Sequence, residues 1–108
     1  MKSSLVDEVR QLLLNMPDTL SFDTLERRKA AIVRISEHAK KHPLYNKSEP
    51  ARASFYAPLR NVSVEKAVQM SWVHFLDRMS NAPTPAHMEG AIVVCFPIIG
   101  DLLRGRGR

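Results

Sequence analysis

The sequence contains one cysteine, so no disulfide can form within a single chain. Proteins of oxidising compartments often rely on disulfides, and a lone cysteine is more typical of a reducing compartment. Cys95 lies in the apolar run AIVVCFPII, which disfavours its thiolate, and no base adjoins it in the sequence. We therefore do not expect Cys95 to act as a catalytic nucleophile.

Glycine is also scarce, and its positions exclude a phosphate-binding loop. The four glycines lie at positions 90, 100, 105 and 107, with no glycine-rich turn among them. His38 and His42 have the spacing of two metal ligands on a helix, but no spacing brings a third ligand to them. We therefore predict that the protein is not an enzyme and has no metal site, no cofactor and no small-molecule substrate.

Long hydrophobic runs are absent. The longest, Ala91–Ile99, has nine residues, whereas a membrane helix needs about 20. The N-terminal sequence MKSSLVDEVRQLLL carries acidic residues within its apolar stretch, unlike a signal peptide. With 44% apolar and 25% charged residues, the composition indicates a globular, soluble, cytoplasmic protein. Peripheral membrane attachment through the apolar C-terminal segment is a weaker alternative.

Apolar residues recur at helical spacing along nearly the whole chain, and prolines separate the periodic segments. The predicted helices are Ser4–Asn15, Asp23–His42, Ser48–Tyr56, Ser63–Met79 and Thr84–Phe96. Pro97 is expected to kink or end the last of them. Short connections between helices favour a compact bundle. The predicted fold is all-α, with about four to five helices.

Residues 91–99 could instead form a buried strand, because Ile-Val-Val-Cys-Phe has strand propensity. We reject this alternative because no other segment offers a partner strand. No internal domain boundary is evident, so residues 1–103 are predicted to form one helical domain. Residues 104–108 then form a basic Arg-Gly tail.

Two apolar stripes, one on the predicted helix Ser4–Asn15 and one on the predicted helix Ser63–Met79, are expected to build either the core or a dimer interface. A tryptophan in such a stripe usually belongs to the core, although it also serves well as an anchor for a partner. A chain of this length buries a modest core, so we expect a homodimer. The interface residues predicted from the two stripes are Leu5, Val9, Leu12, Trp72 and Phe75.

The segment Asp23–His42 carries six of the sixteen lysines and arginines. Asp23 and Glu26 have the spacing of a capping box, and Pro43 disfavours helix beyond His42. A helix of this length is about 30 Å long. Its apolar side is separate from a basic side, and the acidic residues Glu26 and Glu37 lie off the basic line. The residues on the basic side are Arg27, Arg34, His38 and Lys41.

The net charge of +5 and the pI of about 9.8 favour a polyanionic partner. The C-terminal arginines could add phosphate contacts without sequence specificity, or could simply solubilise the end of the chain. Phe55 and Tyr56 lie beside Arg52 and Arg60. Such a group can stack on unpaired bases, although two aromatics in a short helix more often pack.

In the first 42 residues a short predicted helix ends in Met16-Pro17-Asp18 and leads into a long basic helix. This layout resembles the small silencing suppressors of nodaviruses. It implies an all-helical homodimer that binds double-stranded RNA along its axis, independent of sequence. It would make Arg27, Arg34, His38 and Lys41 the phosphate-contacting residues.

We therefore predict a nucleic-acid-binding protein that prefers duplex RNA and covers its phosphate backbone, with suppression of RNA silencing as one role. The alternative is a helical adaptor, chaperone or regulatory protein that binds an acidic protein partner through apolar surface near Trp72 or Ile98–Leu103. The nucleic-acid-binding residues are predicted to be Arg27, Arg28, Arg34, His38, Lys41, Arg104, Arg106 and Arg108.

Overall fold

Helix α6 (Pro85–Gly105) is the centre of the fold in the computed structural model, which describes residues 4–16 and 21–105. Five further helices and two 3₁₀ turns surround it, and the described residues include no strand. These elements are α1 (Leu5–Leu14), α2 (Phe22–Arg27), α3 (Lys29–Lys40), η1 (Asn46–Ser48), α4 (Glu49–Tyr56), η2 (Ala57–Leu59) and α5 (Val64–Asn81). The all-α prediction is confirmed, and the strand alternative for residues 91–99 is wrong.

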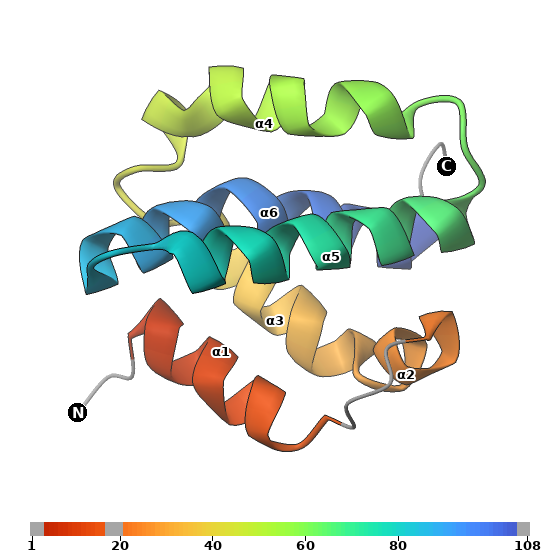
Figure 1. Cartoon of the computed structure of the whole chain (residues 1–108), viewed down its shortest axis with the longest axis horizontal. Helices are drawn as coiled ribbons and strands as arrows, with labels where there is room; N and C mark the ends of the chain where they lie inside the picture. Colours follow the sequence, from red (N-terminus) through yellow and green to blue (C-terminus); the bar gives the residue numbers. More distant parts are fainter. Residues whose placement is uncertain (1–3, 17–20, 106–108) are drawn as a thin grey trace.

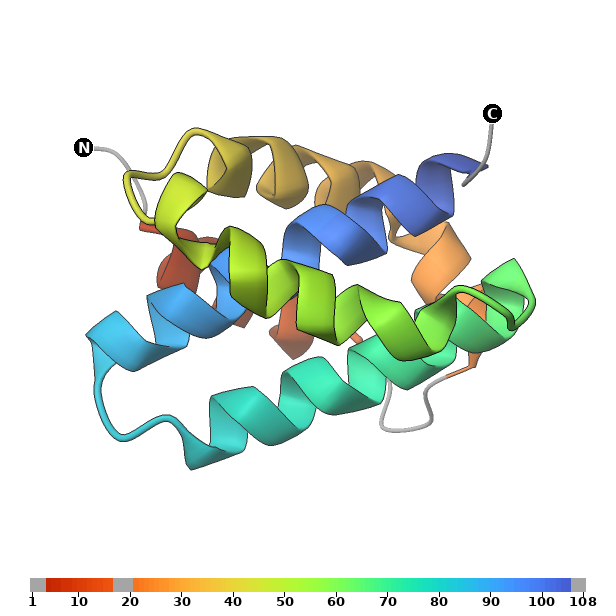
Figure 2. The same cartoon turned by 90° about the horizontal axis from the view of Figure 1, so that it is seen from above.

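The other helices pack around α6 from several sides. It lies between α3 and α5, with α4 over one face and α1 on the opposite face (Figures 1 and 2). By length and composition α6 could cross a membrane, but 61% of its most apolar 18-residue window is buried inside the molecule. Burial of this kind is what the central helix of a globular domain shows.

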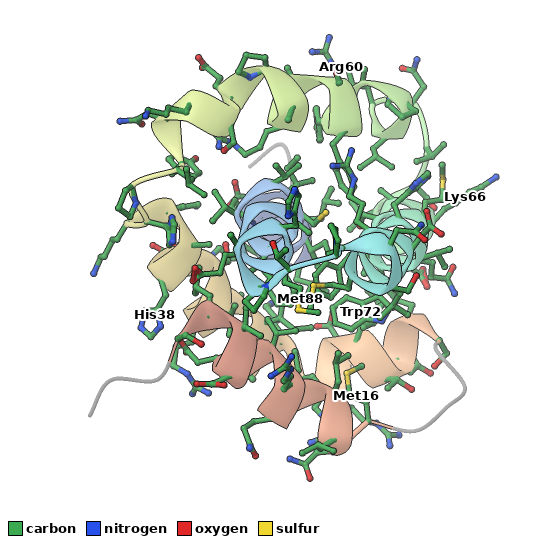
Figure 3. All side chains as sticks on the ribbon, turned by 60° about the vertical axis from the view of Figure 1, so that its left-hand side comes forward. Met16, His38, Arg60, Lys66, Trp72 and Met88 are labelled. Carbon is green, nitrogen blue, oxygen red and sulfur yellow. The ribbon has the colours of Figure 1, made fainter. Side chains whose placement is uncertain are left out.

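Three aromatic rings form the middle of the core. Trp72 and Phe75 of α5 meet Phe96 of α6, with ring centroids 4.8 to 5.9 Å apart, and all three side chains are fully buried. Figure 3 shows Trp72 inside the molecule, beneath α5. The prediction that Trp72 and Phe75 form an interface is therefore wrong, because both lie in the core of one chain.

The apolar stripe of α1 is likewise committed to the core. Leu5 and Leu12 are each 7% exposed and Val9 is fully buried, because α1 packs on both α3 and α6. These three residues are therefore core residues and not interface residues. Of the apolar surface predicted for an adaptor, Trp72, Ile99, Leu102 and Leu103 are buried, whereas Ile98 is half-buried.

The predicted helix Asp23–His42 is two helices. Ser21, and not Asp23, caps α2: its hydroxyl accepts a hydrogen bond from the Thr24 amide at 3.2 Å. The backbone leaves helical geometry at Arg28 (φ −98°, ψ 11°), and α2 turns away from the axis of α3 (Figures 1 and 2). The break has a tertiary cause. α2 packs against α5, where Leu25 is buried, whereas α3 packs against α6.

Pro97 does not end the last helix, which continues to Gly105. Proline removes one backbone hydrogen bond and normally destabilises a helix interior. Here residues 91–97 and Ile99 are buried against the surrounding helices, and this packing keeps the helix continuous. As a result Arg104 is helical, so the predicted boundary of a flexible tail at residue 104 is wrong.

Gly100 permits the close approach of α6 to α3. A Cβ atom at this position would lie 2.5 Å from the Ser36 Oγ and 2.6 Å from the Ser36 Cβ. Ser36 is buried, and its hydroxyl has no hydrogen-bond partner among the described residues. Gly90, in the same helix, has nothing within 4 Å of an added Cβ. The two glycines therefore form a matched pair, one crowded and one open.

Gly100→Ala is expected to lower the free energy of unfolding by about 1–3 kcal/mol, because overpacking outweighs the gain in helix propensity. Gly90→Ala should raise it by about 0.5–1 kcal/mol, since only the propensity term acts there. Urea unfolding followed by circular dichroism measures both. Adding Ser36→Gly to Gly100→Ala should recover part of the loss; equal stability of the two alanine variants would contradict the described contact.

Candidate nucleic-acid interface

Three predicted phosphate-contacting cations are exposed and have no ion-pair partner among the described residues: Arg27, Arg34 and Lys41. Arg34 lies in α3 and Lys41 caps its C-terminus. They are seven residues apart, so they lie on one side of the helix about 10 Å from each other. Arg27 ends α2, before the break, so its position does not follow the period of α3.

His38 does not belong to this free set. Its Nδ1 lies 3.0 Å and 3.1 Å from the two carboxylate oxygens of Glu8 in α1. Figure 3 shows His38 at the edge where α3 meets α1. The basic line that looks unbroken in the sequence is thus interrupted in space by an acidic residue of another helix. His38 is better described as a link between α1 and α3 than as a phosphate ligand.

Arg28 also has a structural role. Its guanidinium Nη2 donates a hydrogen bond to the Asn15 carbonyl oxygen at 2.7 Å, at the C-terminal end of α1. Carbonyl groups at a helix C-terminus lack intrahelical partners and carry partial negative charge, which a cation stabilises. Arg28, the residue at the break between α2 and α3, therefore also caps the C-terminus of α1 through its side chain.

Arg104 takes part in a charge network that joins α3 and α6. Its Nη2 lies 3.0 Å from Glu37 Oε2, and Lys40 Nζ lies 3.4 Å from the same oxygen and 3.0 Å from Asp101 Oδ1. Partial burial opposes the charged form of Lys40, but the hydrogen bond and charge of Asp101, aided by Glu37, raise its pKa overall. Lys40 therefore stays charged at neutral pH. Arg106 and Arg108 lie outside the described residues.

The two histidines of metal-ligand spacing have separate carboxylate partners. His38 contacts Glu8, whereas His42 Nε2 lies 3.8 Å from Glu89 of α6. Both pairs line one hollow between the start of α1, the end of α3 and the start of α6. Across residues 4–16 and 21–105, no three His, Cys, Asp or Glu side chains come close enough to hold one metal ion.

The arginines near α4 stack on the aromatic rings of the protein itself. The Arg52 guanidinium lies 3.6 Å from the Tyr45 ring centroid and also donates to the Tyr45 carbonyl oxygen and the Ser48 hydroxyl. Arg60 lies 5.8 Å from the Tyr56 ring and Arg78 lies 5.7 Å from the Phe55 ring. A guanidinium group thus covers one side of each ring, and the aromatic residues of the short helix, Phe55 and Tyr56, make packing contacts within the protein.

Cys95 is fully buried in α6. Burial raises the pKa of its thiol to about 12, although the positive charge of Arg78 acts in the opposite direction. The thiolate is the nucleophilic form. Cys95 is therefore poorly suited to nucleophilic chemistry near neutral pH.

We expect the Cys95 thiol to react with Ellman's reagent at pH 8 only when the chain unfolds. A pKa near 12 leaves about one thiol in ten thousand ionised at this pH, and the side chain is closed to solvent. Absorbance at 412 nm should show one thiol per chain in guanidinium chloride and a reaction at least a hundredfold slower in buffer. Fast stoichiometric labelling of the folded protein would contradict the buried position.

No family model matches the sequence, and comparisons with curated proteins and with solved structures find no match either. The resemblance of residues 1–42 to the nodaviral suppressors therefore stays a prediction from the sequence.

Proposed function

We propose that the protein is a non-enzymatic, sequence-independent nucleic-acid-binding protein. The observation that carries the proposal is the exposure of Arg27, Arg34 and Lys41 with no ion-pair partner among the described residues. Of the other cations of the same segment, Arg28 and Lys40 are already engaged within the fold. Cations left free on a surface are the groups that can replace counterions along a phosphate backbone.

The acidic residues of α1 limit how a nucleic acid can lie on this surface. Asp7, Glu8, Arg28 and Arg34 line a hollow between α1 and α3, so a phosphate placed there would meet both signs of charge. Arg27 ends α2 and Lys41 follows α3, and neither lines that hollow, although Lys41 lines a second one beside Glu8 and Glu89. The proposed contact therefore uses Arg34 at the rim of the hollow, together with Arg27 and Lys41, and does not extend into it.

Duplex RNA is the preferred ligand in this proposal, and occlusion of that duplex from silencing enzymes is the proposed role. Both rest on the sequence resemblance. A homodimer would double the number of free cations on one duplex. Because the two predicted stripes are buried, its interface would use other apolar side chains, of which Leu14 and Val73 are 76% and 61% exposed.

The triple variant Arg27→Ala/Arg34→Ala/Lys41→Ala should lose most binding to duplex RNA. Each phosphate contact contributes about one unit to the slope of log K against log salt concentration. We expect the slope to fall by about 3 units for each bound chain and the affinity at 100 mM salt to fall at least thirtyfold. Fluorescence anisotropy with a 21-base-pair duplex of two unrelated sequences measures both quantities.

The control is Lys47→Ala/Arg60→Ala/Lys66→Ala, which removes the same charge from exposed positions outside α2 and α3. Arg60, which follows η2, and Lys66 of α5 lie on the far side of the molecule from α1 (Figure 3). This variant should lose only a general electrostatic contribution, about threefold or less. Equal losses in the two variants would disprove a specific face, and undiminished binding by the first variant would disprove the face proposed.

A further inference from the structure

A cleft at the end of the molecule opposite the α2–α3 break is framed by three separate segments. They are the residues before and within η1, the end of α5 with the turn that follows it, and the first part of α6. All three lie at the same end in Figures 1 and 2. The cleft has a volume of about 570 Å³, within the range of roughly 300–1,000 Å³ that holds small molecules.

The floor of this cleft is apolar. Along α6 it consists of small or β-branched residues, and Leu44 and Pro83 close it from the other segments. Leu44 is one of the few large apolar side chains of the described residues that remain exposed, with an exposed fraction of 38%. Gly90 has nothing within 4 Å of an added Cβ, so the space above it is open to an alkyl chain. The α6 residues of the floor are Ala86, Gly90, Ala91, Val93 and Val94.

The ionisable side chains of the cleft are all basic. Lys47, Arg78 and His87 line it, together with the polar residues Ser48 and Asn81 and with no aspartate or glutamate. Four other hollows on the described surface each contain at least one carboxylate. An apolar floor with cations at its rim complements one kind of molecule, namely a hydrocarbon chain that ends in an anion.

We propose that this cleft binds an anionic amphiphile of the medium-chain carboxylate type. The alkyl chain lies along Gly90, Ala91 and Val94, and the carboxylate pairs with Arg78 and Lys47. A planar guanidinium suits bidentate contact with a carboxylate. The proposal is independent of nucleic-acid binding, since none of Arg27, Arg34 and Lys41 lines the cleft.

Titration of the full chain with sodium decanoate, below its micelle concentration, tests the proposal by isothermal calorimetry. One decanoate should bind per chain, and decyltrimethylammonium, with the same alkyl chain and opposite charge, should bind at least tenfold more weakly. In amide NMR spectra decanoate should shift Leu44, Gly90 and Val94, and leave the α2 amides in place. Absence of binding at millimolar decanoate, equal binding of the two ions, or shifts confined to other surfaces would overturn it.

Two variants test the site itself. Gly90→Leu fills the open space and should weaken decanoate binding at least tenfold, whereas Ala30→Leu adds a side chain at an exposed position outside the cleft and should have no effect. Arg78→Gln should weaken binding about tenfold, with Lys66→Gln as the control. Circular dichroism checks folding, and duplex-RNA affinity should be unchanged in Gly90→Leu. Wild-type decanoate affinity in a folded Gly90→Leu protein would exclude the cleft.

Discussion

The contact between α3 and α6 is the constraint on which the rest of the fold depends. Gly100 lets the two helices meet over Ser36 at a distance that no larger residue allows. Beside this contact, Glu37, Lys40, Asp101 and Arg104 join the same two helices through charge. With α3 fixed on one side of α6 and α5 on the other, the apolar length of α6 is covered. The remaining helices then pack against this three-helix layer.

This arrangement also decides which cations are free. α1 packs beside α3, so Glu8 reaches His38, while the end of α1 is capped by Arg28. Surface ion pairs contribute little stability each, typically below about 1 kcal/mol. Their larger consequence is electrostatic, because each paired cation presents less charge to an outside anion. Arg27, Arg34 and Lys41 are among the exposed cations that have no ion-pair partner in the described part of the chain.

The sequence predicts the features that are set locally. Ser63 begins α5 as expected, and its hydroxyl accepts a hydrogen bond from the Lys66 amide, because a cap and a following periodic stripe are neighbours in the chain. Ser48 also precedes a helix as expected, but its side chain does not cap α4. The break at Arg28 could not be predicted, since it follows from α2 and α3 packing against different helices. His38 and Glu8 are 30 residues apart in the sequence, so no local sequence pattern predicts that they pair. A periodic stripe around Trp72 likewise cannot distinguish a core from an interface.

The two proposed binding surfaces would recognise anions by different physics. Exposed cations on α2 and α3 act in water, where affinity for a polyanion comes from counterion release and falls steeply with salt. In the cleft, Lys47, Arg78 and His87 surround an apolar floor, so most of the affinity would come from removing hydrocarbon from water. Salt weakens the hydrocarbon contribution far less. A phosphate backbone has no alkyl chain that could bind in the cleft. A single carboxylate can contact only one of the separated cations on α2 and α3, so it gains little affinity there. One chain can therefore hold both surfaces without either ligand competing for the other's site.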